Sequence, residues 1–167
     1  MEATLGLVGP FSFGRGWPQL RTLAPVAGNE PARFVVPGGR VQRVVAVACK
    51  LVTNAEVFER FVRVNFADSD GNVWSRCPAG TKIEKELTRF FSWNIENVWQ
   101  NALHGNVGLG GLPDARLTGG MVVSVEILNG QAGDAVSQIF LMVEEFPNGP
   151  DGYPTGVQEV APAWNVQ

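Results

Sequence analysis

Alternation of apolar and polar side chains is the clearest pattern in this sequence, and it occupies the middle of the chain. The apolar members of each alternating segment would share one face of an extended strand. These members are Val45, Val47, Cys49 and Leu51; Phe58, Val62, Val64 and Phe66; Met121, Val123, Val125 and Ile127; and Ile139, Leu141 and Val143. Strands of this kind, separated by turn residues, predict an antiparallel β-sandwich or barrel.

The last alternating segment is apolar on both faces. Phe140 and Met142 lie on the face opposite Ile139, Leu141 and Val143. We therefore predict a strand that is covered on both sides.

The segment from Ile83 to Trp99 fits two structures. As a strand its apolar face would carry Ile83, Leu87, Phe91, Trp93 and Ile95, and as a helix Ile83, Leu87, Phe90, Phe91, Val98 and Trp99. The aromatic centre, Arg89 to Trp93, favours the strand. A short helix from about Ile95 to His104, ended by Gly105, would then follow it.

The stretch FADSDGNVW, Phe66 to Trp74, places Asp68, Asp70 and Asn72 at alternate positions. Oxygen ligands with this spacing can converge on a hard cation. A loop of the EF-hand type starting at Asp68 would have Ala79 at its twelfth position, where a bidentate carboxylate is needed. Asp-Gly between alternating segments is instead typical of a β-hairpin. We predict the hairpin, keep the cation site as its alternative, and predict no cofactor.

The two ends of the chain lack any alternation and are rich in glycine and proline. We predict an extended N-terminal arm (1–31), a β-sandwich domain (32–146) and an extended C-terminal arm (147–167). Aromatic side chains on such arms are costly to leave in water, so we predict that they contact the body or a neighbouring molecule. They are Phe11, Phe13, Trp17 and Trp164. Removing residues 1–31 is expected to leave the sandwich folded.

Composition narrows the function classes. Charged residues make up 17% of the chain and apolar residues 45%, which indicates that a partner covers part of the surface. A net charge of −3 argues against direct nucleic-acid binding. The N-terminus does not predict a secretory signal, and no apolar run approaches the roughly 20 residues of a membrane helix. Cys49 lies in an apolar strand, which favours a buried free thiol over a disulfide with Cys77 and fits a reducing cytoplasm.

Nothing in the sequence forms a catalytic pattern. His104 is the single histidine, and it lacks a nearby orienting carboxylate or a nucleophile that it could activate. The run GNVGLGG, residues 105–111, is superficially like a phosphate loop but lacks the following Lys-Ser/Thr. We predict a protein that is not an enzyme.

The tryptophans raise sugar binding as an alternative function, because indole faces stack on pyranose rings. Trp93 lies on the apolar face of its predicted strand and is expected in the core. Trp74 follows the hairpin and could be exposed. We interpret Trp17 and Trp164 as interface anchors, a role in which tryptophan is enriched.

Two passages resemble small virion structural proteins of tailed bacteriophages. The first, VTNAEVFERFVRVNFADSDGNVW (52–74), has a Thr-Asn turn, an Arg-bearing strand and an Asp-Gly-Asn hairpin. The second, LPDARLTGGMVVSVEILNGQAGDAVSQIFLMVEEF (112–146), has a Leu-Pro loop, a Gly-Gly bend, an NGQAGD turn and a closing apolar strand. The resemblance spans about residues 40–146 and leaves the arms outside it.

The resemblance implies an all-β, jelly-roll-like sandwich that decorates or cements a phage head, with a neck or tail position as the alternative. Its partners would be the major capsid protein or other virion proteins. It would be located in the virion after assembly in the host cytoplasm. A capsid lattice offers threefold positions, which would suit a homotrimer.

Overall fold

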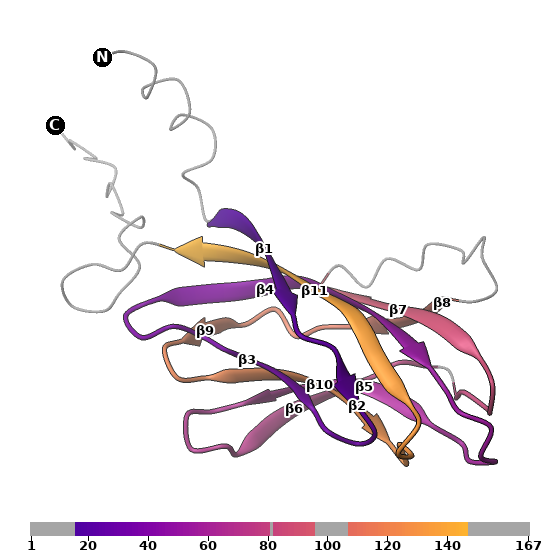
Figure 1. Cartoon of the computed structure of the whole chain (residues 1–167). Coiled ribbons are helices and arrows are strands. Elements are labelled where there is room, and N and C mark those ends of the chain that lie inside the picture. The colour runs from indigo at the N-terminus through magenta and orange to yellow at the C-terminus, as the bar shows by residue number, and fades with distance from the viewer. Residues whose placement is uncertain (1–15, 81, 96–106, 147–167) are drawn as a thin grey trace, which may run out of the picture.

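The computed structural model describes residues 16–80, 82–95 and 107–146, and every regular element among them is a β-strand. The predicted all-β fold is thus confirmed (Figure 1). The strands are β1 (Trp17–Leu23), β2 (Val26–Ala27), β3 (Ala32–Val35), β4 (Val41–Val52), β5 (Phe61–Ala67), β6 (Val73–Pro78), β7 (Thr88–Asn94), β8 (Val107–Gly111), β9 (Arg116–Thr118), β10 (Val122–Leu128) and β11 (Ala135–Phe146).

The strands form two sheets with jelly-roll topology. The larger sheet has the order β1-β11-β4-β7-β8, with β2 paired to β11 and β9 paired to β4. The smaller sheet has the order β3-β10-β5-β6. The antiparallel pairs β1–β11, β3–β10, β4–β7 and β5–β6 are nested within one another along the chain, which is the double Greek-key arrangement of a jelly roll.

One pairing departs from the predicted antiparallel pattern. β7 and β8 run parallel, with Phe91 opposite Gly108 and Trp93 opposite Gly110. A parallel pair needs a connection of about a dozen residues, and residues 95–106 supply that length. The helix expected from about Ile95 to His104 falls almost entirely outside the described residues.

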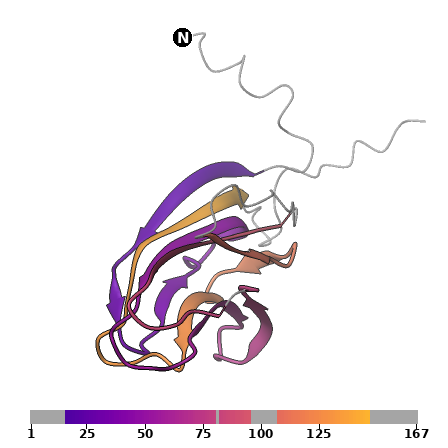
Figure 2. The same cartoon turned by 90° about the vertical axis from the view of Figure 1, so that its right-hand side faces the viewer.

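The core lies between the two layers, which Figure 2 shows curving around a shared interior. It is built from alternate residues of the strands, as the sequence pattern predicts for Val123, Val125 and Ile127. The most completely buried side chains include Leu51, Phe66, Phe91, Trp93, Ile139 and Leu141. The strand predicted at Arg89 to Trp93 is therefore confirmed as β7, with Phe91 and Trp93 inward.

A β-bulge changes which residues of β4 face the core. Val143 pairs with Val44 but Met142 pairs with Ala46, so Val45 is an extra residue in β4. Because one inserted residue exchanges the two faces of a strand, Val44 is buried and Val45 is not. The prediction that Val45 belongs to the apolar face is wrong for this reason.

Phe58 also departs from its predicted place. It precedes β5 and is half exposed, whereas Val62, Val64 and Phe66 of that predicted face are buried. A loop therefore separates Phe58 from the strand whose alternation it continues in the sequence.

Part of the predicted N-terminal arm belongs to the sheet. β1 pairs with β11 from Trp17↔Glu145 to Leu23↔Ile139, and Val26 pairs with Val136. Leu23 and Val26 also pack against the core. Removing residues 1–31, which was expected to leave the sandwich folded, would therefore also remove an edge strand of the larger sheet. Residues 1–15 and 147–167, with Phe11, Phe13 and Trp164, lie outside the described residues.

Candidate interaction surface

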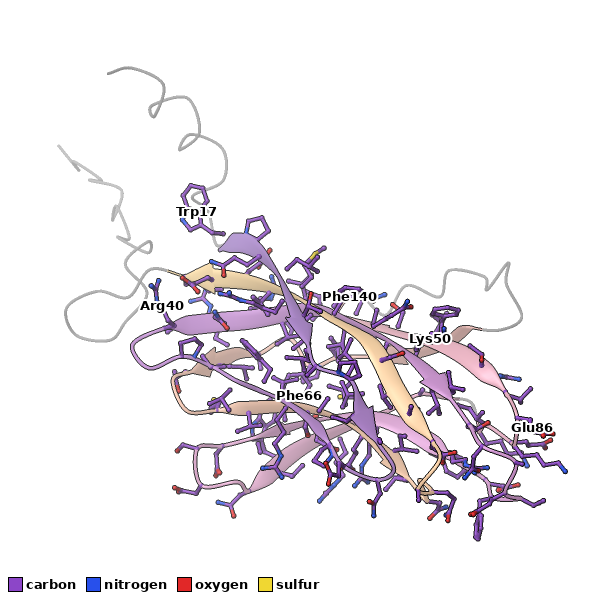
Figure 3. The ribbon with its side chains drawn as sticks, in the orientation of Figure 1. Trp17, Arg40, Lys50, Phe66, Glu86 and Phe140 are labelled. Atoms are coloured by element: carbon purple, nitrogen blue, oxygen red, sulfur yellow. The ribbon has the colours of Figure 1, made fainter. Side chains whose placement is uncertain are left out.

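A row of large apolar side chains lies on the outer face of the larger sheet. Leu20 of β1 is 64% exposed, Phe90 of β7 is 47% exposed, and Phe140 and Met142 of β11 are 39% and 46% exposed. Figure 3 shows Phe140 on the side of this sheet that faces away from Phe66, which lies between the layers. The sequence predicted that this face of β11 would be covered, but among the described residues nothing covers Phe140 and Met142.

Strand register brings these side chains together around two alanines. Leu20 pairs with Met142, and Met142 pairs with Ala46. In the next row Phe140 pairs with Ala48, and Ala48 pairs with Ser92. Ala46 and Ala48 therefore lie between the large side chains of β11 and two polar residues of β7, Asn94 and Ser92. Phe90 of β7 lies one row further along, opposite Lys50. We call Leu20, Ala46, Ala48, Phe90, Phe140 and Met142 the outer strip.

The chemistry of the outer strip is that of a protein contact. Exposed apolar surface of this kind marks interaction sites. Leu20, Met142 and Phe140 are neighbours on this face, and their side chains bring apolar area with no charge of their own to desolvate. Lys50, labelled in Figure 3, is on the same face as Ala48 and pairs with Phe90, so one charged group lies within the strip beside that ring. The sequence indicated Phe140 and Met142, but Leu20 and Phe90 become part of the strip only through strand pairing.

Both ends of the described chain lie at one end of the larger sheet. Trp17 begins β1 opposite Glu145, one residue before β11 ends at Phe146. Trp17 is exposed there and projects beyond the strand (Figure 3). Of the predicted interface anchors it is the one that the structure describes, and its contacts with a partner stay a prediction.

The Asp68–Asn72 segment is the predicted hairpin between β5 and β6. The amide N–H of Asp68 donates to the Asn72 carbonyl at 3.0 Å, and Gly71 has φ +87°. The Asp68 carboxylate accepts from the backbone N–H groups of Asp70 and Asn72 at 3.0 and 2.8 Å and from the Asn72 side chain at 2.9 Å. The Asn72 side chain, followed by its backbone N–H, lowers the pKa of Asp68.

These hydrogen bonds occupy the Asp68 oxygens and hold the Asn72 side chain toward the carboxylate. Within residues 16–80, 82–95 and 107–146, no group of three or more histidine, cysteine, aspartate or glutamate side chains is placed to hold a metal. The geometry thus supports the turn and gives the alternative cation site no additional ligand. No helix able to cross a membrane occurs among the same residues.

The two cysteines are separate buried thiols. Cys49 and Cys77 are both free, as the sequence predicts for Cys49. Burial raises the pKa of the Cys49 thiol to about 12. Burial also raises the pKa of Cys77, although a hydrogen bond with Ser75 works in the opposite direction.

The tryptophans divide between core and surface. Trp93 is fully buried, and its indole N–H donates to the Cys77 carbonyl at 3.1 Å, which confirms its predicted core position. Trp74 is partly exposed next to the hairpin, with its ring 5.4 Å from that of Phe66. Trp99 and His104 lie outside the described residues.

The glycine-rich run that superficially resembles a phosphate loop has a packing role in β8. A Cβ on Gly108 would lie 2.6 Å from the Phe91 ring, and one on Gly110 would lie 2.2 Å from the Trp93 ring. Because the two glycines have no Cβ, the aromatic rings of Phe91 and Trp93 in β7 can pack directly against the backbone of β8. A side chain at either position would require those rings to move.

A buried ion pair, which sequence reasoning missed, fixes the loop before β5. Arg60 Nε donates to Asp134 at 2.8 Å, and both side chains are fully buried. The Arg60 guanidinium also donates to the carbonyls of Glu56 and Phe58 and to the Asn54 side chain, at 2.7, 3.0 and 2.5 Å. No spacing rule could have found a pair whose members lie 74 residues apart.

Comparison with known proteins gives little beyond this geometry. No protein family and no curated protein sequence matches the chain. One solved structure to which it is similar comes from the T13 IBDV viral particle, at 10% identity and a TM-score of 0.37. The match covers 77% of this chain and 31% of that one, so this chain spans about a third of the other's length.

Proposed function

We propose that this protein is a structural, non-enzymatic subunit of a tailed-phage virion that decorates the head. The outer strip is the observation that carries the proposal, because it presents apolar side chains on a rigid sheet in a pattern that fits a protein partner. Its partners would be the major capsid protein or other virion proteins, including neighbouring copies of this chain. A jelly roll supports this role but does not specify it, since viral capsid proteins, lectins and cupins share the fold.

The energetics suit a repeated contact. Burying the exposed halves of the four large side chains of the strip contributes roughly 3–6 kcal/mol, from which the cost of association is subtracted. One such contact is weak. Many copies held on one shell would act together, because each bound copy raises the effective concentration of the next contact.

Immunogold electron microscopy tests the proposal. Antibody to the purified protein is applied to particles from the source culture, with particles lacking the protein as control. Label spread evenly over heads is the expected result. Label at one vertex or along the tail would replace the head assignment with a neck or tail position, and particles without label would overturn the virion role.

Trp74 supports a second candidate function, carbohydrate binding. Its ring is partly exposed beside the hairpin, where a pyranose could stack on it. Titration of the protein with a panel of glycans should quench tryptophan fluorescence if this function is real, and Trp74→Ala should abolish the quenching. A flat response to every glycan would reject it.

A further inference from the structure

We propose that the outer face of the smaller sheet binds an acidic protein segment through a row of polar side chains that crosses the sheet. The row consists of Arg33 of β3, Ser124 of β10, Asn65 of β5 and Arg76 of β6, and we call it the polar row. The inference concerns a second surface and does not depend on what the outer strip binds.

Strand register places the four side chains in one line. Ser124 pairs with Arg33 on one side and with Asn65 on the other, and Asn65 pairs with Arg76. Residues next to them in the sequence belong to the core: Ala32, Val64, Phe66, Cys77, Val123 and Val125. Because successive side chains of a strand point to opposite faces, the polar row lies on the outer face of this sheet. Figure 1 shows the sheet as the layer opposite β4, β7 and β11.

The two arginines that end the polar row are exposed and have no ionic partner. Within residues 16–80, 82–95 and 107–146, neither Arg33 nor Arg76 makes a side-chain hydrogen bond or an ion pair. Arg63, in the next row, differs because it is paired with Glu126 beside it. The polar row thus presents two unpaired positive charges on a chain whose net charge is −3, and these charges call for an anionic partner.

The distance between the two arginines suits carboxylates of one extended segment. Three strand spacings separate Arg33 from Arg76, so their Cα atoms lie about 14 Å apart. In an extended segment, side chains four residues apart lie on one side and about 13 Å apart. Two acidic side chains with that spacing would reach both guanidinium groups.

Asn65 indicates that the partner also brings a hydrogen-bond donor. Its side chain is only 4% exposed, and its amide oxygen Oδ1 is buried without a hydrogen-bond partner. An unsatisfied buried acceptor is costly, and it needs an N–H or O–H group, which a carboxylate lacks. A protein segment supplies carboxylates for the arginines and a backbone N–H for Asn65.

The same features disfavour a nucleic-acid backbone as the partner. Phosphate groups bring acceptors and no donor for Asn65, and two unpaired cations are few for a partner whose affinity rests on neutralising many phosphates. The row beside the polar row is apolar, since Val35, Val122 and Ala67 lie in register there and Val35 is exposed. Polar contacts next to apolar area are typical of contacts between proteins.

Fluorescence anisotropy at low salt tests the inference on the full-length protein. The probe is a labelled peptide that alternates glutamate and threonine, and the same peptide with glutamine in place of glutamate is the control ligand. The test variant is Arg33→Gln with Arg76→Gln. The matched control variant is Lys50→Gln with Lys85→Gln, which removes the same charge from β4 and from the loop before β7.

We expect the acidic peptide to bind the test variant at least fivefold more weakly than it binds the wild-type protein or the control variant. The glutamine peptide should bind the wild-type protein at least fivefold more weakly than the acidic one. No binding of the acidic peptide, or equal binding by the two variants, would overturn the inference.

A labelled single-stranded oligothymidylate separates the two classes of anion. If it binds the wild-type protein more tightly than the acidic peptide does and loses binding in the test variant, the polar row binds nucleic acid and the inference is overturned. These measurements use no particles, so the polar row can fail its test while the virion role stands.

Discussion

Arg60 and Asp134 carry opposite charges at a place from which water is excluded. Burial alone would raise the pKa of Asp134, but Arg60 and the backbone N–H groups of Asn54 and Gln131 reverse that effect, and the pKa of Asp134 is lowered. Both N–H groups donate at 2.8 Å. The pair joins the loop before β5 to the turn before β11, and each partner needs the other, because an uncompensated buried charge is very costly.

Replacing Asp134 by Asn is expected to lower the free energy of unfolding by about 3–5 kcal/mol, because Arg60 is left buried without a counter-charge. Urea unfolding at pH 7 measures the change. Asp114→Asn is the control: that carboxylate pairs with Arg43 at 2.6 Å but is exposed, so its loss should barely move the midpoint. Equal midpoints for the two variants would contradict the role given to the buried pair.

The same carboxylate gives stability a defined pH dependence. Because the pKa of Asp134 is lowered by folding, its contribution is fully present above the unfolded value of about 4 and is lost as pH falls through the lower, folded value. Below about pH 4 the wild-type protein should therefore lose stability more steeply than Asp134→Asn. Unfolding midpoints measured between pH 2 and pH 7 would refute this if the two curves ran parallel.

Gly110 is the position in β8 where a methyl group should be least tolerated. Its Cβ would lie 2.2 Å from the Trp93 ring and 3.0 Å from the Pro78 carbonyl oxygen. Gly110→Ala should therefore lower the free energy of unfolding by about 1–3 kcal/mol through overpacking. Gly38→Ala, with nothing within 4 Å of its Cβ, should leave stability unchanged or slightly higher. Thermal unfolding of both variants compares them directly, and similar melting temperatures would argue against the packing role of β8.

β1 sets the limit for truncation of the N-terminus. Removal of residues 1–15 should leave the circular dichroism spectrum and the unfolding midpoint close to those of the full chain, because β1 stays paired with β11. Removal of residues 1–31 should cause a large loss of stability, since it strips β1 and β2 from β11 and uncovers the core beside Leu23 and Val26. Two truncations of equal stability would mean that β1 contributes little to the sheet.

The sequence predicted the strands that are buried on one face and missed those that are defined by their neighbours. Val123, Val125 and Ile127 alternate because one side of β10 is core, so periodicity alone finds them. β1 lies at a sheet edge and has Pro18 and an exposed Leu20 on its outer face. Its residues therefore do not alternate between apolar and polar as those of a strand with one buried face do. β8 has glycines where a strand would normally show apolar side chains, because the rings of β7 fill that space.

The candidate surface was predictable in part for the same reason. Phe140 and Met142 signalled a second apolar face of β11, since both faces of one strand can be read from its own residues. Leu20 and Phe90 join them only through strand pairing: Leu20 pairs with Met142 near the other end of the chain, and Phe90 pairs with Lys50 of β4. The Val45 bulge further shifts the register of β4, and such an insertion leaves no mark in the alternation. The position of the outer strip therefore required the folded arrangement.

If the outer strip holds the protein on a particle, charge placed there should remove binding without unfolding the sandwich. Phe140→Glu with Met142→Glu puts two carboxylates on an already exposed face, so the unfolding midpoint should change little while immunogold label on particles falls at least tenfold. Val35→Glu is the matched control, because Val35 is also exposed and apolar, at 54%, but lies on the smaller sheet. Particles mixed with each purified variant and then pelleted give the bound fraction. If both variants lose binding equally, the cause is general electrostatic repulsion by the shell. If the double variant binds fully, the contact with the particle lies on another face of the jelly roll.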